Sequence, residues 1–335
     1  MTERVQALFA MTAENLPLVF PPELLARLRA CVDIDPALVA RDFTEPRVRA
    51  ALARTEILVT GWGCPRLEAD VLDAAPRLRA VLHAAGSVKG FTGPEVWRRG
   101  IAVSSAAAAN ALPVAEYTLA MILLTGKDVF ALRDRLREGR AFPYDGVLTG
   151  VGNLGRRVGV VGASRIGRRL IELLRPFDLA VALADPYVDA PEAARLGVPL
   201  LPLDELLATS DTVSLHAPHT AETRRLIGAR ELALMPDGAV LINTARGALV
   251  DHEALTAELR AGRLGAVLDV TDPEPLPAGS PLYDLPNAFV TPHLAGSQGN
   301  ELARLGRVVV EEAERLSSGA ALRYPVDRAE LERTA

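Results

Sequence analysis

The sequence predicts an α/β protein with two domains, each a Rossmann-like or flavodoxin-like fold around a parallel sheet. Short β-branched runs alternate with helical patterns along most of the chain, which is typical of parallel sheets with helices on both faces. The length of 335 residues suits two domains of about 150 residues each. A glycine-containing turn near the middle of the chain also has the spacing of a dinucleotide-binding unit.

The dinucleotide-binding pattern lies in Val158–Asp185, which reads VGVVGASRIGRRLIELLRPFDLAVALAD. Val158–Val161 is expected as a strand, the next residues open a helix with leucines at helical spacing, and Ala180–Ala184 is expected as a second strand. The first glycine of such a turn permits the tight bend, and the last lets the helix pack close to the strand. N–H groups at the helix start can then bind phosphates. The predicted cofactor contacts at this turn are Gly162, Ser164, Arg165, Ile166 and Gly167.

An acidic residue closes this pattern. Asp185 ends the second strand about 20 residues after the turn, where an acid accepts the ribose hydroxyls. Its charge would repel a 2′-phosphate, so NAD is favoured over NADP. Ser164 replaces the middle glycine of the motif and weakens it. The alternative is an ordinary βαβ crossover whose glycines serve only packing.

Composition excludes several classes of function. With 37 basic and 42 acidic residues the net charge is −5, which suggests neither a nucleic-acid nor a membrane-surface partner. No apolar run approaches the roughly 18 residues of a membrane helix, and the N-terminus lacks the features of a signal peptide. Cys31 and Cys64 are too few for a disulfide framework, which fits a reducing compartment. We expect a cytoplasmic protein without a metal site.

The first 110 residues show the alternation without a glycine fingerprint, so we expect the nucleotide-binding half elsewhere. Strands are expected at Val5–Ala10, Ile57–Thr60, Ala80–His83 and Ile101–Ser104. Helices are expected at Pro22–Ala30, Glu45–Ala53, Leu67–Ala74 and Pro94–Arg99.

A long apolar segment separates the two halves. Pro113 is expected at a helix start, with Val114–Gly139 as one long helix and Asn110 just before it. The helix is apolar nearly all round in its first part, which indicates burial between domains or subunits. Ala141–Asn153 contains glycines and a proline and is expected as a surface loop.

Polar clusters follow the strands of the second half, and ligands bind at the carboxyl ends of parallel strands. The expected strands Thr212–His216, Ala239–Asn243, Ala266–Val270 and Ala288–Thr291 end in HAP, TARG, DVTDPEP and PHLAGS. The expected helices here are Leu203–Thr209, Asp251–Gly262 and a final one at Gly299–Leu316, long enough to cross back to the first domain.

Three residues in these clusters can carry chemistry. Arg246 lies in a glycine-flanked turn, where its guanidinium could bind a carboxylate through two donors. Glu274 lies between two prolines, and His293 follows Pro292 at another strand end. A structural ion pair, a solvated loop carboxylate and a structural histidine are the plain alternatives. A histidine held by a carboxylate near an arginine is instead the usual composition of a general acid/base site.

Taken together, INTARGALVDHEAL, GAVLDVTDPEPLP and FVTPHLAGS, in this order behind the glycine turn, resemble the D-2-hydroxyacid dehydrogenase family. LHAPHTAETRRLIG and ALPVAEYTLA extend the resemblance, which runs from about His83 to Gly299. It implies that Arg246 binds the substrate carboxylate and keto oxygen, and that His293 donates the proton to that oxygen. Glu274 would hold the imidazole in its charged form. The further cofactor contacts that the resemblance implies are His216, Ala217, Pro218, Thr244, Ala245 and Asp269.

The resemblance also implies a domain arrangement and a partner. Residues 1–110 and 300–335 would form the substrate domain, and 111–299 the inserted NAD-binding domain. The family is usually a homodimer, formed through the helix near Pro113 and the loop before the glycine turn. The expected activity is NAD-dependent interconversion of a small 2-keto acid and its D-2-hydroxy acid.

The substrate loop departs from the family pattern. It reads HAAGSVKGF, with Lys89 in or near the position of a family acid. The predicted substrate contacts are Ala85, Gly86, Ser87, Lys89 and Asn110. An extra cation would suit a more highly charged substrate, and phosphite-oxidising relatives have a similar Lys-Gly-Phe, so oxidation of a phosphite-like anion is an alternative. Glu274 argues against formate dehydrogenase, which has glutamine there. An NAD-sensing binding protein, similar to corepressor relatives, is the alternative of another class.

Overall fold

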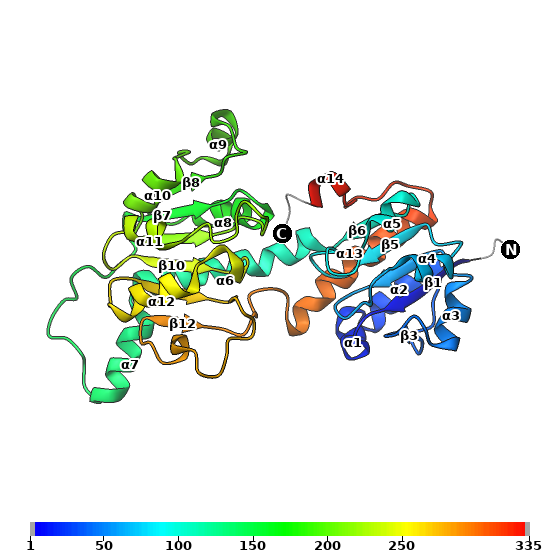
Figure 1. The fold of residues 1–335 in the computed structure, drawn as a ribbon, viewed down its shortest axis with the longest axis horizontal. Helices are drawn as coiled ribbons and strands as arrows, with labels where there is room; N and C mark the ends of the chain where they lie inside the picture. Colours follow the sequence, from blue (N-terminus) through cyan, green and yellow to red (C-terminus); the bar gives the residue numbers. More distant parts are fainter. Residues whose placement is uncertain (1–3, 332–335) are drawn as a thin grey trace. The chain divides into compact units, whose positions relative to one another are not determined.

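The computed structural model describes residues 4–331, which form two compact α/β units (Figure 1). Unit 1 contains the chain up to Ala111 and again from Ser297, and unit 2 is Leu112–Gly296. Each unit has one parallel sheet, so the predicted fold class is confirmed. The ends of the predicted substrate domain, residues 1–3 and 332–335, lie outside the described residues.

The sheet of unit 1 has the order β2-β1-β4-β5-β6, and β3 also pairs with β1. Its strands, all in parallel pairing, are β1 Val5–Ala10, β2 Val32–Asp33, β3 Val39–Ala40, β4 Ile57–Thr60, β5 Ala80–His83 and β6 Ala102–Ser105. β2 pairs with the start of β1 and β3 with its end, so the two short pieces act as one interrupted edge strand. Counted this way, the order is that of a flavodoxin-like fold.

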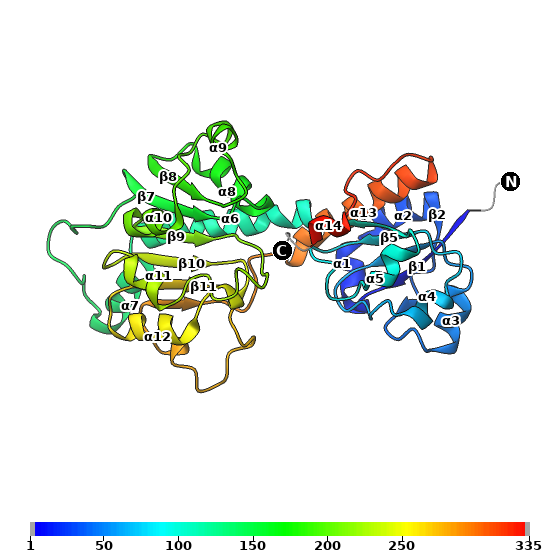
Figure 2. The same cartoon turned by 45° about the horizontal axis from the view of Figure 1, so that its top comes forward.

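Helices cover both faces of this sheet (Figure 2). One face is covered by α1 Leu16–Val19, α2 Pro22–Cys31 and α13 Leu302–Ser317, and the other by α3 Pro46–Leu52, α4 Ala69–Asp73 and α5 Pro94–Arg98. Side chains alternate along β1 as a strand requires, with Phe9 in the first layer and Leu8 in the second. The remaining short elements are η1 Ala13–Asn15, η4 Gly299–Glu301 and α14 Arg328–Leu331.

The sheet of unit 2 has the order β12-β11-β10-β9-β7-β8. Its parallel strands are β7 Arg156–Val161, β8 Leu179–Ala184, β9 Thr212–Leu215, β10 Val240–Asn243, β11 Gly265–Leu268 and β12 Ala288–Val290. Beyond β8, the Leu183 N–H donates to the Pro199 carbonyl at 2.9 Å and the Leu201 N–H donates to the Leu183 carbonyl at 2.8 Å. This reduced strand completes the order of a Rossmann fold, in which the first strand lies between the second and the fourth.

Helices also cover both faces of the second sheet. One layer contains α8 Arg165–Leu174, α9 Ala190–Leu196 and part of α6 Ala107–Gly126, and the other contains α10 Leu203–Thr209, α11 Ala229–Leu234 and α12 His252–Arg260. The 3-10 turns η2 Gly247–Leu249 and η3 Pro281–Tyr283 lie in the connections. Phe130 of α7 Val129–Gly139 stacks on Phe289 of β12, with ring centroids 4.2 Å apart.

The prediction of one helix from Val114 to Gly139 is wrong at both its start and its continuity. α6 begins at Ala107, so Pro113 lies inside it. An alanine-rich start favours helix strongly enough to extend it past the proline, which leaves one carbonyl without its helical donor. The helix ends at Gly126, whose carbonyl accepts from the Gly152 N–H at 2.7 Å. Asp128 then has φ 51° and starts α7 in a new direction.

α6 also differs from the expectation that no segment reaches membrane length. Within the described residues it is long and apolar enough to cross a bilayer by length and composition, with mean hydropathy 1.4 over its best window. Core helices meet the same criterion, and Ala115 and Ile122 of α6 are buried in the core of unit 2. This feature is therefore weak grounds for a membrane span.

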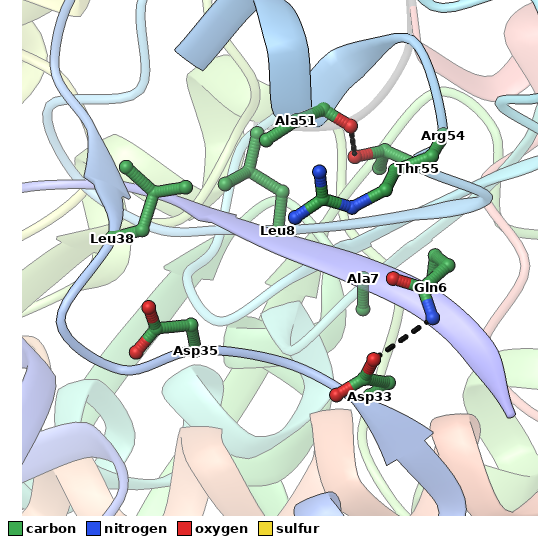
Figure 3. A pocket seen from close by; sticks show the side chains of 9 residues that line it. All are labelled: Gln6, Ala7, Leu8, Asp33, Asp35, Leu38, Ala51, Arg54 and Thr55. Atoms are coloured by element: carbon green, nitrogen blue, oxygen red, sulfur yellow. Dashed lines mark hydrogen bonds between the residues drawn. The ribbon is translucent and has the colours of Figure 1, made fainter. Parts of the chain in front are cut away.

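Unit 1 has a small surface pocket beside β1 (Figure 3). It holds about 60 Å³ and is lined by Gln6, Ala7, Leu8, Asp33, Asp35, Leu38, Ala51, Arg54 and Thr55. Gln6 Nε2 donates to Asp33 Oδ2 at 2.9 Å, and Thr55 Oγ1 donates to the Ala51 carbonyl at 2.9 Å. The volume suits a few water molecules, and no residue from the predicted site lines it.

The close packing of α13 on α1 generates a stability prediction. A Cβ at Gly306 would lie 1.8 Å from the Val19 carbonyl oxygen, so Gly306→Ala forces backbone apart and should destabilise unit 1 by about 1–3 kcal/mol. Both tryptophans, Trp62 and Trp97, lie in unit 1, so tryptophan fluorescence during urea unfolding reports on this unit. Gly90→Ala is the control because a Cβ there has no neighbour within 4 Å. Equal midpoints for the two variants would contradict the prediction.

Candidate active site

The glycine turn after β7 is shaped by two close backbone approaches. Gly162 has φ +97°, and a Cβ there would lie 2.6 Å from the Ala217 backbone nitrogen. A Cβ at Gly167 would lie 2.1 Å from the Gly162 carbonyl oxygen. Both positions therefore require glycine, the first for conformation and space and the second for space alone. These glycines do serve packing, and the turn that they allow also begins α8, whose N-terminal N–H groups can bind phosphate.

Ser164, which replaces the middle glycine of the motif, has a structural function of its own. It is the N-cap of α8, with extended φ −62° and ψ 177°, and its Oγ accepts from the Gly167 N–H at 3.3 Å. A serine is a favoured N-cap, so the side chain stabilises the helix start that a glycine would leave uncapped. The N–H groups of Arg165 and Ile166 occupy the first two helical positions, which no helix carbonyl reaches. These two groups are free to bind phosphate oxygens.

Asp185 joins the end of β8 to the glycine turn. Its Oδ2 accepts from the Ala163 N–H at 2.6 Å and its Oδ1 from the Tyr187 N–H at 2.8 Å. An ionised carboxylate has about four acceptor positions, so further positions are open to ribose hydroxyls. The carboxylate is thus fixed by the backbone before any ligand binds.

His216 lies behind the same turn and is fully buried. Ser214 Oγ and His216 Nε2 are 2.8 Å apart, while His216 Nδ1 has no partner in the described structure. Burial lowers the pKa of His216 to about 3, so the ring is neutral. Ala217 packs on Gly162, and the Pro218 carbonyl accepts from Thr223 Oγ1 at 2.6 Å. The glycine cradle, the open helix N-terminus and the fixed acid together fit a dinucleotide.

The strongest polar contact of the predicted catalytic residues is the pair Glu274–His293. Glu274 Oε1 lies 2.6 Å from His293 Nδ1, and their side chains are 41% and 51% exposed. His293 has φ 52°, in the left-handed region that residues other than glycine seldom adopt. The Asp272–Pro273 and Glu274–Pro275 peptide bonds are both cis. The structure therefore brings into hydrogen-bond contact the two residues that the family resemblance places together.

Asp269 holds the His293 turn in this strained conformation. Its buried carboxylate accepts from Thr291 Oγ1 at 2.6 Å, the Leu294 N–H at 2.8 Å and the Ala295 N–H at 2.9 Å. Its backbone carbonyl accepts from the His293 N–H at 2.9 Å. Three of about four acceptor positions are thus used within the protein. The sequence assigned Asp269 to the cofactor, and the structure adds its function as the anchor of this turn.

Arg246 is placed by the turn that follows β10. The Asn243 side chain closes the turn, with Nδ2 donating to the Arg246 carbonyl at 2.8 Å and Oδ1 accepting from the Ala245 N–H at 3.1 Å. A Cβ at Gly247 would lie 2.0 Å from the Thr271 carbonyl, so the turn packs directly on the segment that leads to Glu274. Burial lowers the pKa of Arg246, and the charge of Glu274 opposes this shift. A half-buried arginine therefore lies within electrostatic reach of the Glu274–His293 pair.

Three residues of this site were missed by the sequence analysis. Tyr117 and Thr118 of α6 and Thr291 after β12 make hydrogen bonds with the predicted catalytic turns. For the two residues of α6, the available signal was a pair of adjacent hydroxyls within a mostly apolar helix. Their partners are far away in sequence, so the signal did not say what they bind.

The predicted substrate loop lies in unit 1, after β5. His83 Nδ1 lies 2.9 Å from Thr60 Oγ1, and its ring packs on Phe91 with centroids 4.7 Å apart. Burial lowers the pKa of His83 to about 3, so a neutral ring anchors the loop. Gly86 faces the Asn110 side chain, since a Cβ there would lie 3.5 Å from its Nδ2.

The other predicted members of this loop differ in exposure. Ala85 is fully buried, Ser87 is half-buried and Lys89 is exposed. Ser87 Oγ accepts from the Lys89 N–H at 3.4 Å, which shapes the turn. Asn110 Oδ1 accepts from the Ser297 N–H at 3.0 Å and so connects α6 to the segment before α13. The structure thus brings Gly86 and Asn110 together, while the side chain of Ala85 faces the core.

The fold and this site define a Rossmann-type nucleotide-binding protein, and comparison with known proteins gives its family. Residues 119–295 match the model of the D-isomer specific 2-hydroxyacid dehydrogenase NAD-binding domain. The chain is 33% identical to a glyoxylate reductase from Korarchaeum cryptofilum, over 73% of this chain and 75% of that protein. This protein belongs to the D-isomer specific 2-hydroxyacid dehydrogenase family, and its cofactor is NAD.

Other relatives agree with this assignment. The chain is 37% identical to a D-3-phosphoglycerate dehydrogenase from Mycobacterium tuberculosis, over 76% of this chain but 48% of that protein. It therefore spans about half the length of the phosphoglycerate dehydrogenases it matches. The crystal structure of the TT0316 protein from Thermus thermophilus covers 96% of this chain and 99% of its own, with a TM-score of 0.77 and 34% identity.

The geometry at Asp185 predicts the cofactor preference. Because its carboxylate is fixed beside the glycine turn, the 2′-phosphate of NADPH should be repelled and NADH strongly preferred. Asp185→Asn keeps an acceptor and removes the charge, so the ratio of NADPH to NADH affinity should rise about tenfold or more. Cofactor titration by fluorescence measures the ratio. Asp189→Asn, at a helix N-cap nearby in sequence, is the control. Parental NADPH affinity equal to NADH affinity would remove the basis of this prediction.

Proposed function

We propose that this protein is an NADH-dependent reductase of a small 2-keto acid, producing the D-2-hydroxy acid. The observation that carries the proposal is the Glu274–His293 contact of 2.6 Å, with half-buried Arg246 within electrostatic reach, in an NAD-binding unit. A carboxylate-held histidine supplies a proton, and an arginine binds an anionic substrate. This combination fits a substrate that has a carboxylate beside a reducible carbonyl.

His293 is proposed as the general acid. Its Nδ1 is engaged by Glu274, which leaves Nε2 to give a proton to the substrate oxygen. The bound cofactor supplies the hydride that reduces the carbonyl carbon. The contact with Glu274 holds the ring in one orientation for this transfer.

Arg246 is proposed to bind the substrate carboxylate and to polarise its keto oxygen. Its planar guanidinium can donate two parallel hydrogen bonds to a carboxylate, which lysine cannot do. The desolvation that lowers its pKa also strengthens its attraction for an anion. In unit 1, Gly86, Ser87 and Asn110 are proposed as further substrate contacts. Glyoxylate, hydroxypyruvate and pyruvate are the first candidate substrates.

We also propose a cytoplasmic homodimer. The segment after α7 extends away from the body of unit 2 in Figure 1, and it carries large apolar side chains. Phe142, Val147 and Leu154 are 79%, 90% and 87% exposed. Exposed apolar side chains of this number favour burial against a second copy of the chain.

A substrate panel tests the proposed activity. NADH oxidation is measured with glyoxylate, hydroxypyruvate and pyruvate, and NAD reduction is measured with phosphite. Turnover of at least one keto acid supports the proposal. Phosphite turnover with inert keto acids overturns it in favour of oxyanion oxidation, and NADH binding without any turnover favours a binding protein.

Substitution of the three proposed catalytic residues should change different kinetic constants. His293→Ala should lower kcat by about 10²–10⁴ because the general acid is lost. Arg246→Lys keeps the charge but loses the paired donors, so it should raise KM for the keto acid about tenfold or more. Glu274→Gln weakens the hydrogen bond that orients the imidazole, because an amide oxygen is a weaker acceptor than a carboxylate, so it should lower kcat by a smaller factor than His293→Ala. Steady-state kinetics measures all three effects.

The common control for these variants is NADH binding, which each should retain. Arg260→Lys, on the last turn of α12, is the matched control for the arginine substitution. If His293→Ala keeps near-parental turnover and Arg246→Lys is also tolerated, the mechanism proposed here is wrong.

A further inference from the structure

Two consecutive residues of α6 reach the two turns that hold the proposed catalytic side chains. Tyr117 bonds to the turn of His293, and Thr118 bonds to the turn of Arg246. Both partners belong to unit 2, as do these two residues. One helix is thus hydrogen-bonded both to the turn of the proposed proton donor and to the turn of the proposed carboxylate-binding residue.

The first of these connections is a chain of hydroxyls. Thr291 Oγ1 donates to Asp269 Oδ1 at 2.6 Å, because an ionised carboxylate can only accept. Thr291 has one hydroxyl proton, so Tyr117 Oη must donate to Thr291 Oγ1 at 2.8 Å. The His293 N–H donates to the carbonyls of both Thr291 and Asp269, at 3.0 and 2.9 Å. The Tyr117 hydroxyl therefore stabilises Thr291 and Asp269, the two residues whose carbonyls accept from the His293 N–H.

The second connection is also a pair of hydroxyls whose donor and acceptor can be assigned. Thr118 Oγ1 donates to the Val114 carbonyl at 2.7 Å within α6, so it accepts from Thr244 Oγ1, 2.9 Å away. Thr244 lies two residues before Arg246 in the turn that Asn243 closes. Thr118 is fully buried and Thr244 nearly so, which makes this hydrogen bond difficult to replace by water.

The protonation of Tyr117 is compatible with this arrangement. Burial raises the pKa of Tyr117, and the negative charge of Asp269 raises it further. The phenol thus stays protonated and remains a donor at all working pH values.

Thr125, further along α6, has a hydroxyl that makes no bond outside the helix in the described structure. It donates to the Met121 and Ile122 carbonyls of α6 itself, which is the usual arrangement for a threonine in a helix.

We propose that Tyr117 and Thr118 are positioning residues for the reaction: Tyr117 sets the turn of His293, and Thr118 sets the turn of Arg246. They act through Thr291, Asp269 and Thr244 and do not touch the substrate. A helix is a rigid element, so adjacent attachments on α6 would fix the distance between the proton donor and the carboxylate-binding group. This inference rests on the proposed function.

The two attachments should separate in kinetics. Tyr117→Phe removes one hydroxyl and should lower kcat for keto-acid reduction about three- to tenfold, with KM changed less than about twofold. Thr118→Val should instead raise KM for the keto acid about three- to tenfold, with the smaller effect on kcat. A merely structural role of α6 would move both constants in both variants together with the unfolding midpoint.

Matched variants sharpen this test. Thr125→Val makes the same substitution in the same helix and should leave kcat and KM at parental values. Thr118→Ser retains the hydroxyl and should restore the KM that Thr118→Val loses. Tyr117→Phe combined with Thr291→Val should be no worse than Thr291→Val alone, because both changes break one chain of hydrogen bonds.

A second measurement does not depend on turnover. In the free protein, histidine ring NMR signals are recorded, with that of His293 assigned by its loss in His293→Ala. Tyr117→Phe should shift this signal, and Thr118→Val and Thr125→Val should leave it in place. Failure of the parent to turn over any keto acid would refute the proposed function alone, and the NMR shift would still decide the role of Tyr117. An unmoved His293 signal in Tyr117→Phe, or equal kinetic losses in Thr125→Val, overturns the inference.

Discussion

The buried carboxylate of Asp269 is the interaction on which the site of unit 2 depends. It accepts from Thr291, Leu294 and Ala295, and its own backbone carbonyl accepts from His293. A left-handed residue persists only where its surroundings over-determine its conformation. Four hydrogen bonds to Asp269 meet that requirement and hold the turn that contains His293 in place. The conformation of this turn is thus a consequence of one buried carboxylate that accepts three hydrogen bonds from the protein.

Close backbone approach also shapes the site. Gly162, Gly167 and Gly247 each lie where a Cβ would overlap a neighbouring backbone atom. The first two fold the turn that presents the start of α8, and the third presses the Arg246 turn onto the segment leading to Glu274. Ser164 shows the opposite case, because its side chain improves the helix start without blocking it. Glycine is needed in this site where backbone meets backbone, and a small capping residue suffices elsewhere.

α6 connects these features to the rest of unit 2. Its apolar residues Ala115 and Ile122 pack in the core, while its hydroxyls at Tyr117 and Thr118 bond to the turns of His293 and Arg246. Core packing makes the helix stiff, and stiffness is what makes a hydrogen-bonded attachment effective for positioning. The same helix therefore serves both stability and the geometry of the site.

The sequence by itself determined the alternation of strands and helices, the cofactor turn with Asp185, and the order of the motifs that contain Arg246, Glu274 and His293. These features follow from local patterns, since strand periodicity, turn glycines and helix caps act over a few residues. Only the tertiary structure decided where α6 ends, because the Gly126 carbonyl accepts from the N–H of Gly152, which lies beyond α7 in the chain. It also decided that β2 and β3 form edge strands. Both are too short to show a periodic pattern in the sequence, and they are strands because they pair with β1.

The same division applies to the site. The hydrogen bonds Tyr117–Thr291 and Thr118–Thr244 join residues 174 and 126 positions apart. No local pattern specifies a partner at such a separation, because the pairing depends on how the helix packs against the ends of β10 and β12. The sequence therefore determined which groups could carry chemistry, and the packing of the chain decided which groups hold them in place.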